Sequence, residues 1–391
     1  MEAGARVHTQ PLVVYGPRSN HYDFGHDHPL TPRRFGPGID LLRELGADRF
    51  LAPPTATDAE LLRVHERAYV AEVRMLSDYP EAAAWAGFDS RDTPPFYDMH
   101  DAAATVAGGS LAAIDRILSG EAVHAFHPGG GLHHAHAARA SGFCVYNDVA
   151  LAIARARDAG HRVLYVDLDV HHGDGVEAIF WNDPHVLTVS IHETGLVLFP
   201  GTGFVEDRGG HEAPGSAVNS PLVPGTSDRS WMAVVETVVA PLAAAFGPSV
   251  LVTQHGSDSH LLDPLAHLNV TTAGMARAAQ LLDDIAHAYT EGRWLATGGG
   301  GYDVYRVVPR AWGLVWLAQA HEPVPDATPE AWRQRWAGEA ATYHQSPPPA
   351  VMLDPTGTAP AEAEGLNERD LATAQAALEH TLRVLAEQGR A

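Results

Sequence analysis

The sequence predicts an α/β fold: a single large three-layer domain in which a central, mostly parallel sheet carries helices on both faces. Three observations lead to this prediction. Short apolar runs stop abruptly at polar or glycine-rich turns, segments rich in Ala, Leu and Arg lie between them, and 391 residues suffice for one large domain. Apolar strands that alternate with amphipathic helices are typical of a parallel sheet covered on both sides.

Each element of this fold has its own signal. The apolar runs that predict buried strands are residues 12–15, 163–166, 186–191, 250–253 and 294–297. The segments with helical composition are residues 149–159, 231–246, 274–289 and 368–388. Polar or glycine-rich stretches follow four of the runs, at residues 167–174, 192–193, 254–258 and 298–302. Ligands of such sheets bind beyond the carboxyl ends of the strands, so we expect one rim to carry the functional site.

Composition divides the chain near residue 321. Residues 1–321 contain all the predicted strands and form the expected main domain. From residue 322 onward the sequence becomes rich in Ala, Glu and Pro and ends in the last predicted helix. We expect residues 322–391 to be a proline-rich and helical C-terminal extension that packs on the main domain.

Composition also narrows the classes of function. The formal net charge of −22 argues against binding a phosphate backbone, so no nucleic-acid partner is expected. No apolar run of about 18 residues predicts a membrane span. The first residues lack the apolar core of a signal peptide, so we expect a cytoplasmic protein without a membrane partner. The single cysteine, Cys144, excludes an internal disulfide, and all 26 basic residues are arginine.

The most informative stretch is residues 166–175, which complete and follow a predicted buried strand. Buried carboxylates and imidazoles cost several kcal/mol unless something pairs with them. Side chains alternate along a strand, so we expect Asp167, Asp169 and His171 to point the same way and to offer ligands for a divalent cation. Asp174 has a simpler alternative explanation, as the cap of a short helix.

Three other stretches add candidate groups. The adjacent imidazoles of His133 and His134 follow three glycines and could transfer protons. Asp258 could supply a third metal ligand or be an ordinary loop carboxylate. Four glycines at residues 298–301 could cradle a phosphate, but Tyr302 follows them in place of the usual Lys-Ser/Thr. We therefore favour a loop that delivers a phenol as a hydrogen-bond donor.

These groups predict metal-assisted hydrolysis of a carbonyl bond such as an amide. An Asp, a His and a distant Asp form a three-ligand site with an open position, the arrangement of catalytic zinc, and iron(II) could fill the same site. A metal there would activate water, the histidine pair would carry the proton, and the tyrosine would stabilise the oxyanion. No serine or cysteine nucleophile has a matching motif, since Cys144 lies among aromatic residues and is typical of a packed thiol.

The motifs resemble those of the arginase/deacetylase superfamily, in its histone deacetylase branch. The matching motifs occur in family order between residues 15 and 320, at residues 129–134, 142–148, 166–175, 199–203 and 298–302. Two segments, at residues 22–30 and 94–96, resemble the subgroup of bacterial acetoin utilization proteins more closely. The resemblance implies an arginase/deacetylase-like sheet, zinc-dependent deacetylation, and an acetylated protein or peptide as substrate, with an acyl-CoA synthetase as a candidate.

The resemblance assigns a role to each candidate of the reaction. The residues implied to bind zinc, or iron(II) in its place, are Asp169, His171 and Asp258. His134 would act as general base and then general acid, and His133 would mainly stabilise charge. Asp174 would orient His134, and Asp167 would orient His133. Tyr302 would donate a hydrogen bond to the acyl carbonyl.

The resemblance also implies how substrate and a second cation bind. Phe143, beside Gly142, and Phe199 would line a narrow tunnel for the lysine stem. Asp89 would hold the substrate backbone at the rim, and Arg34 would lie near the exit for acetate. A structural potassium ion is also implied, and its ligands would include Asp167 and Ser190.

Two positions depart from the common pattern of the branch. Ser257 stands where alanine is common, beside the metal-binding aspartate, and could tune the metal. Leu265 stands where polyamine deacetylases carry a glutamate, which favours acyl-lysine over an acetylpolyamine. Deacetylation of a small acetylated amine remains the alternative activity, and a non-catalytic binding protein on the same fold is the alternative class. The sequence leaves the oligomeric state open.

Overall fold

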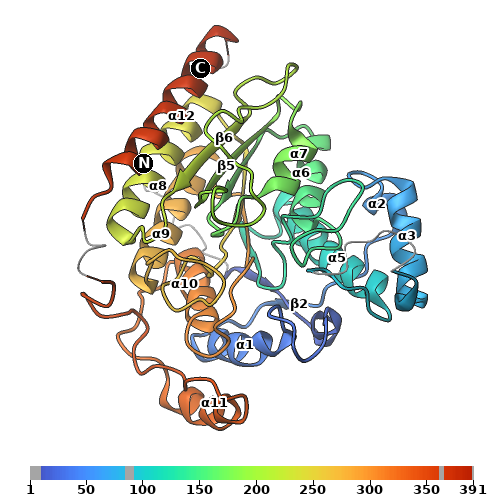
Figure 1. The fold of residues 1–391 in the computed structure, drawn as a ribbon, viewed down its shortest axis with the longest axis vertical. Helices are drawn as coiled ribbons and strands as arrows, with labels where there is room; N and C mark the ends of the chain where they lie inside the picture. Colours follow the sequence, from blue (N-terminus) through green and yellow to red (C-terminus); the bar gives the residue numbers. More distant parts are fainter. Residues whose placement is uncertain (1–9, 84–91, 361–364, 390–391) are drawn as a thin grey trace, which may run out of the picture.

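The computed structural model describes residues 10–83, 92–360 and 365–389. Across these residues, eight strands form one sheet in which every paired neighbour runs parallel (Figure 1). Their order across the sheet is β2-β1-β3-β8-β7-β4-β5-β6. The strands are β1 (Leu12–Val14), β2 (Phe50–Leu51), β3 (His124–His127), β4 (Val163–Asp167), β5 (Val186–Glu193), β6 (Ala217–Leu222), β7 (Val250–Gln254) and β8 (Trp294–Thr297). The predicted parallel α/β fold is confirmed.

Helices cover both faces of the sheet, with α8, α9, α10 and α12 on one side and α5, α6 and α7 on the other (Figure 1). Within the described ranges the α-helices are α1 (Phe35–Glu44), α2 (Asp58–Leu61), α3 (Arg67–Asp78), α5 (Met99–Leu118), α6 (Asp148–Asp158), α7 (Asp174–Phe180), α8 (Asp228–Phe246), α9 (Thr272–Tyr289), α10 (Val308–Ala320), α11 (Glu330–Thr342) and α12 (Glu368–Glu387). The four helices predicted from composition correspond to α6, α8, α9 and α12.

The side chains of each strand alternate between the two faces of the sheet. They therefore contribute to two hydrophobic cores, one on each face. Along β4, Val163 and Tyr165 pack with residues of α5, α6 and α7, while Leu164 and Val166 pack with residues of α8, α9 and α10. All four side chains are buried. This two-residue period explains why the strand is apolar throughout, as expected when both faces of a parallel sheet are covered.

The strands β2, β3 and β6 are not among the predicted ones. β2 has only two residues, and β3 (His-Ala-Phe-His) and β6 (Ala-Val-Asn-Ser-Pro-Leu) interrupt their apolar residues with polar ones. β6 lies at the edge of the sheet, where Pro221 is tolerated because one side of the strand needs no partner. A run of apolar residues is therefore a sufficient but not a necessary signal for a strand in this sheet.

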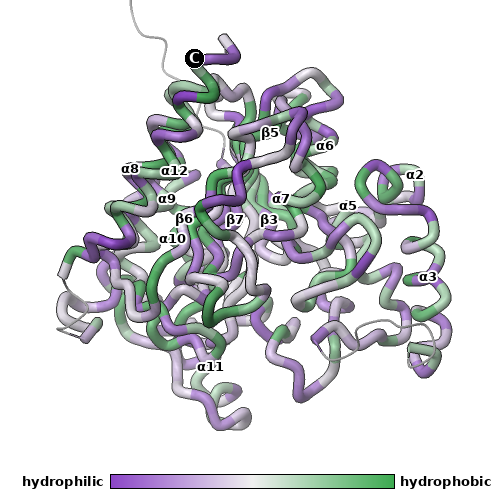
Figure 2. Tube along the Cα trace, turned by 45° about the horizontal axis from the view of Figure 1, so that its top comes forward, coloured by the Kyte–Doolittle hydropathy of each residue, from purple (hydrophilic) through white to green (hydrophobic). Residues whose placement is uncertain are grey.

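The residues of the C-terminal extension contribute to the main hydrophobic core. α12 packs against α8 and β6, and it alternates between hydrophilic and hydrophobic residues along its length (Figure 2). Trp332 of α11 is fully buried and donates from Nε1 to the carbonyl of Pro37 at 2.8 Å. Asp354 accepts a 2.9 Å charged hydrogen bond from Arg310 of α10. The extension therefore contacts the sheet, the N-terminal helix α1 and the helix that precedes it.

Of the described helices, α8 alone is long and apolar enough to cross a membrane by length and composition. It is instead a core helix, since 56% of that stretch is buried and the helix packs against α9 and α12. Its apolar character follows from its place between the sheet and two neighbouring helices.

Candidate active site

The carboxyl ends of four neighbouring strands, β3, β8, β7 and β4, meet at one edge of the sheet. The loops that follow them are residues 128–134, 298–302, 255–258 and 168–173. The pair at the end of β5 does not join this group, because His192 contacts Ser190 and Gly203 while Glu193 pairs with His267. Three of the four expected stretches thus converge, together with the loop after β3.

Asp169, His171 and Asp258 form a compact buried group. Nδ1 of His171 lies 3.0 Å from Oδ1 of Asp169 and 3.2 Å from Oδ2 of Asp258. Strand alternation was expected to align Asp167, Asp169 and His171, but β4 ends at Asp167, and Asp169 and His171 lie in the loop beyond it. Asp167 turns instead to His133. Two loops, the one after β4 and the one after β7, bring Asp169, His171 and Asp258 together.

Neighbouring groups hold the two carboxylates of this set in place. Asp169 Oδ2 accepts hydrogen bonds from Nε2 of Gln254 at 2.6 Å and from the amide of Gly300 at 2.9 Å. Asp258 Oδ1 accepts from the amide of Val170 at 3.1 Å. A Cβ atom on Gly300 would lie 2.0 Å from Oδ2 of Asp258, so the glycine loop is needed for this close approach.

The donor set fits a divalent metal such as zinc or iron(II). Among the described residues, Oδ2 of Asp258 is buried and has the ion-pair contact with His171 but no well-aligned hydrogen bond. Burial together with the charge of Asp169 raises the pKa of Asp258 to about 6. Burial would lower the pKa of His171, but the two carboxylates raise it to about 10. A proton on His171 therefore balances the two anions, and a cation bound by one nitrogen and two carboxylates would replace that proton.

His133 and His134 face each other through their Nε2 atoms, which lie 3.0 Å apart. On the far side of each ring, Nδ1 contacts a carboxylate at 2.7 Å, Asp167 for His133 and Asp174 for His134. Burial and the charge of His133 lower the pKa of His134 to about 3. Burial would also lower the pKa of His133, but Asp167 and Asp169 raise it to about 9. Near pH 7 the pair thus consists of a cationic His133 and a neutral His134.

Both partner carboxylates are themselves fixed. Asp167 accepts a 2.6 Å hydrogen bond from the hydroxyl of Tyr165, and Oδ2 of Asp174 lies 3.0 Å from Nε2 of His136. Each carboxylate keeps its imidazole in the tautomer that has Nδ1–H. In His134 this leaves the lone pair on Nε2, the atom that lies 3.0 Å from Nε2 of His133.

Aromatic rings surround the entrance to this group. Phe143 packs edge-on against Tyr302 with ring centroids 5.9 Å apart, and Phe199 packs edge-on against His134 at 5.0 Å. Phe199 is 42% exposed, which places it at the surface end of the site. Gly142 has φ +54, and a Cβ atom there would lie 2.3 Å from Cδ2 of His134. The backbone at Gly142 therefore passes directly beside the imidazole.

Tyr302 lines a small cavity together with both histidines of the pair. The cavity has a volume of about 20 Å³ and is also lined by Phe143, Asp169, His171 and Gly300. That volume is enough for about one water molecule. Burial and the charges of Asp258 and Asp169 raise the pKa of the Tyr302 phenol well above its usual value, so it remains a hydrogen-bond donor. The amide of Tyr302 donates to Oδ2 of Asp263 at 2.9 Å, which fixes its backbone.

A second cavity, also about 20 Å³, adjoins the first and shares Leu30 and Leu132 with it. Arg34 lines this inner cavity and is 4% exposed. Its NH1 group donates to the carbonyl of Gly299 at 2.8 Å. A buried guanidinium therefore lies on the inner side of the site, next to the glycine loop.

Residues 28–319 match the model of the histone deacetylase domain. The chain belongs to the histone deacetylase family. Among its relatives, the acetoin utilization protein AcuC of Bacillus subtilis (strain 168) is 41% identical over 332 residues, covering 83% of this chain and 86% of that protein. AcuC of Staphylococcus xylosus is 39% identical over 331 residues, with 83% and 86% coverage. The predicted family and its acetoin utilization subgroup are confirmed.

Solved structures of the histone deacetylase family agree with this fold. A crystal structure of a histone deacetylase homologue complexed with SAHA has a TM-score of 0.82 and 26% identity, covering 94% of this chain and all of that one. A homologue from Aquifex aeolicus has a TM-score of 0.79 and 25% identity, with the same coverage. The metal-ligand candidates described above thus belong to a histone deacetylase fold.

Asp148 and Asn147 also shape this histone deacetylase site, although the sequence did not predict this role. Asp148 is fully buried and accepts hydrogen bonds from the amides of Gly131 and Leu132 and from the hydroxyl of Ser110. Asn147 donates to the carbonyls of residues 133 and 135. An Asn-Asp pair at a helix start is a common capping signal, so its second task, holding the loop of the histidine pair, leaves no separate trace in the sequence.

The remaining candidates have different surroundings. Ser190 is the register partner of Asp167 across β4 and β5, and its hydroxyl contacts Nδ1 of His192 at 2.8 Å. Leu265 is half-buried and does not line the small cavity, and Asp89 lies outside the described residues. His172, for which the sequence suggested no role, lies between Thr202 and Glu177 at 2.9 and 3.2 Å.

Proposed function

We propose that this histone deacetylase family member removes the acetyl, or a related acyl, group from lysine side chains of proteins. The proposal rests on one small cavity that is lined by two metal-ligand candidates, a neutral imidazole and a phenol, with the third metal-ligand candidate directly behind the first two. The residues concerned are Asp169, His171, Asp258, His134 and Tyr302. Hydrolysis of an unactivated amide needs water activation, proton transfer and oxyanion stabilisation, and this set offers a group for each.

Asp169, His171 and Asp258 would hold zinc, or iron(II), with one position left for water and substrate. When bound, such a metal would polarise the acyl carbonyl and make water a stronger acid. Because the protein supplies two carboxylates and one imidazole, the ligand set carries enough negative charge to offset the ion.

His134 is the general base of the proposed reaction. Its lowered pKa keeps it neutral near pH 7, and Asp174 holds its proton on Nδ1 so that Nε2 accepts the proton of the attacking water. The same Nε2 then returns that proton to the departing lysine amine. His133 carries a positive charge that Asp167 stabilises, and it opposes the negative charge that develops on the acyl group.

Tyr302 donates its phenolic hydrogen to the developing oxyanion. Phe143 and Phe199, with Gly142 beside the first, form the walls that receive the aliphatic stem of the substrate. Arg34 borders the inner cavity, where its charge would attract the acetate product on its way out. The family resemblance assigns the binding of the substrate backbone to Asp89, which lies outside the described residues. We further propose a structural potassium ion near Asp167 and Ser190.

We propose that the protein acts in the cytoplasm on an acetylated protein or peptide, and that an acyl-CoA synthetase is the candidate substrate. The support is the relationship to proteins named for acetoin utilization. We also propose residues 1–321 as the deacetylase domain and residues 322–391 as an extension that stabilises it, because Trp332 and α12 pack into its core.

A comparison of substrates tests this proposal against the small-amine alternative. Acetate release would be measured for an acetyl-lysine peptide and for acetylputrescine with the zinc-loaded protein. The apolar Leu265 offers no carboxylate for an internal ammonium, so the peptide should have the higher kcat/KM, and Leu265→Glu should shift the ratio toward acetylputrescine. A wild-type preference for acetylputrescine by orders of magnitude would replace the proposed substrate with the small amine.

A further inference from the structure

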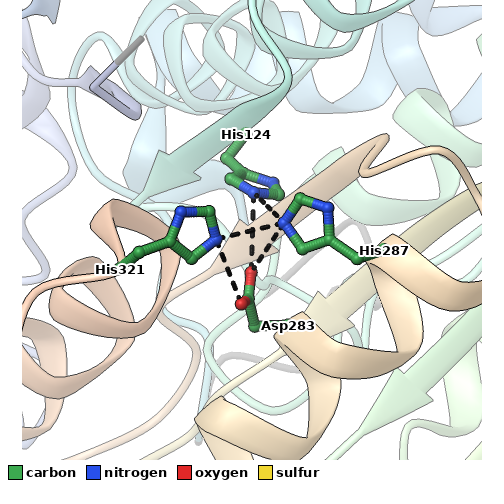
Figure 3. Close-up of side chains that lie close together, drawn as sticks. All are labelled: His124, Asp283, His287 and His321. Atoms are coloured by element: carbon green, nitrogen blue, oxygen red, sulfur yellow. Dashed lines mark hydrogen bonds and ion pairs between the residues drawn. The ribbon is translucent and has the colours of Figure 1, made fainter. Parts of the chain in front are cut away.

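A second cluster of His and Asp side chains lies near the amino ends of the strands, at the end of the sheet opposite the candidate active site. Figure 3 shows three imidazoles and one carboxylate that point toward a common centre. His124 begins β3, Asp283 and His287 lie one turn apart on α9, and His321 caps the end of α10. The candidate active site follows the carboxyl ends of the parallel strands, whereas His124 stands at the amino end of one. The cluster is therefore separate from the proposed reaction.

We propose that this cluster is a structural zinc site, hereafter the amino-edge site. Its ligands are Nε2 of His124, Nε2 of His287, Nε2 of His321 and the carboxylate of Asp283. Four protein ligands leave no open position, which is the arrangement of a structural rather than a catalytic zinc ion. Three imidazoles and one carboxylate are nitrogen and oxygen donors that zinc accepts readily.

Five contacts between the ligand groups have distances close to those of a tetrahedral zinc site. With zinc–nitrogen bonds of about 2.0–2.1 Å, neighbouring ligands at the corners of a tetrahedron lie about 3.3–3.4 Å apart. Here the Nε2 atoms of His287 and His124 are 3.2 Å apart, and those of His287 and His321 are 3.0 Å apart. Oδ1 of Asp283 lies 3.5 Å from Nε2 of His124 and from Nε2 of His287, and Oδ2 lies 3.2 Å from Nε2 of His321. Small movements would therefore suffice to close the site around an ion.

The candidate active site provides an internal comparison. Its ligand atoms are 3.0 and 3.2 Å apart, the same range as in the amino-edge site. In the described part of the chain, these are the two groups of at least three His, Cys, Asp or Glu side chains whose ligand atoms all lie within 4.8 Å. The amino-edge group has four ligands in place of three, and the fourth ligand makes it a closed set.

The close approach of the three ring nitrogens also favours a metal ion. Nε2 of His287 lies within 3.2 Å of two other Nε2 atoms, but a single ring nitrogen donates or accepts in only one of these directions at a time. Protonating the rings would place like charges in contact. A zinc ion would instead accept the lone pairs of all three nitrogens and pair with the negative charge of Asp283.

The backbone at His321 supports the same conclusion. This residue has φ +56 at the end of α10, a left-handed conformation that glycine most often supplies at this position of a helix. A histidine there is held in an uncommon conformation with its imidazole turned into the cluster. The free energy of binding an ion would offset the cost of this left-handed conformation.

Access and location are suited to a structural ion. The side chains of His124 and Asp283 are each 3% exposed, while those of His287 and His321 are 25% and 28% exposed. Solvent-borne zinc therefore reaches the exposed pair, and the buried pair anchors it. The ion would join the start of β3, α9 and the end of α10, directly before the C-terminal extension begins.

Zinc content per chain tests the inference. The full-length protein and its variants would be equilibrated with zinc, dialysed and analysed for metal by mass spectrometry. Asp258→Asn should empty the candidate active site and leave one zinc per chain, and adding His321→Gln to it should leave none. His321 is partly exposed, so this second substitution should preserve the fold, which circular dichroism checks. His380→Gln, a partly exposed histidine on α12, is the matched control and should retain the zinc.

A second readout uses cobalt in the Asp258→Asn protein. Tetrahedral cobalt should give intense visible absorption that disappears with His321→Gln and persists with His380→Gln. Absence of bound zinc in the Asp258→Asn protein would overturn the inference, as would one zinc that survives His321→Gln. If the wild-type and Asp258→Asn proteins each bind one zinc that His321→Gln removes, the amino-edge site stands and the proposed catalytic metal falls.

Discussion

The replacement Tyr302→Phe separates transition-state stabilisation from folding. The change removes one hydroxyl group, and within the described residues that hydroxyl makes no hydrogen bond of its own. The edge-on contact of the ring with Phe143 and the hydrogen bond from the Tyr302 amide to Asp263 do not involve the hydroxyl. We therefore expect an unchanged melting temperature.

The effect on the reaction should be large. Removing one donor to an oxyanion typically lowers kcat by about 10²–10³-fold, equivalent to about 2.7–4 kcal/mol. Because the hydrogen bond forms in the transition state, kcat and kcat/KM should fall together while KM stays nearly constant. The assay is steady-state acetate release from an acetyl-lysine peptide by the zinc-loaded protein. A loss of less than fivefold, with the fold intact, would refute the role assigned to Tyr302.

Two further substitutions test other parts of the structure. Gly142→Ala would place a Cβ atom 2.3 Å from His134 and 2.9 Å from Phe199, so kcat/KM should fall by at least about 10²-fold, and wild-type kinetics would show that the backbone there has room. Asp354→Asn would leave the buried Arg310 without its carboxylate, so chemical denaturation should show a loss of about 3–5 kcal/mol at pH 7. Burial opposes ionisation of Asp354, but the hydrogen bond from His260 and the charge of Arg310 hold the pKa of Asp354 well below its usual value. The wild-type protein should therefore lose this stability as the pH falls below about 4, and the variant should show a weaker dependence there; equal pH profiles would contradict the assignment.

The strands were predictable from the sequence where each is a continuous run of apolar residues. Runs such as Val163–Asp167 and Val250–Gln254 are buried on both faces of the sheet, and their composition shows it. β3 was not predictable in this way, because His124 and His127 at its ends take part in polar contacts of their own. Its place in the sheet depends on pairing with β1 and β8, which a local sequence pattern does not contain.

The candidate site was predictable as a set of residue types but not as a geometry. The sequence pointed to Asp169, His171 and Asp258, although the expected pleat of a strand is not what unites them. The amino-edge site shows the limit more clearly. His124, His287 and His321 are far apart in a chain with 24 histidines, so only the packing of α9 and α10 against β3 reveals that they meet.

The proposed metal-dependent deacetylation can be measured as acetate release from an acetyl-lysine peptide by zinc-loaded and by metal-stripped protein. We expect the loaded protein to release acetate, the stripped protein to lose this activity, and the activity to return when zinc is added back. Equal release with and without metal, or no release from any acyl-lysine substrate after zinc loading, would contradict this proposal.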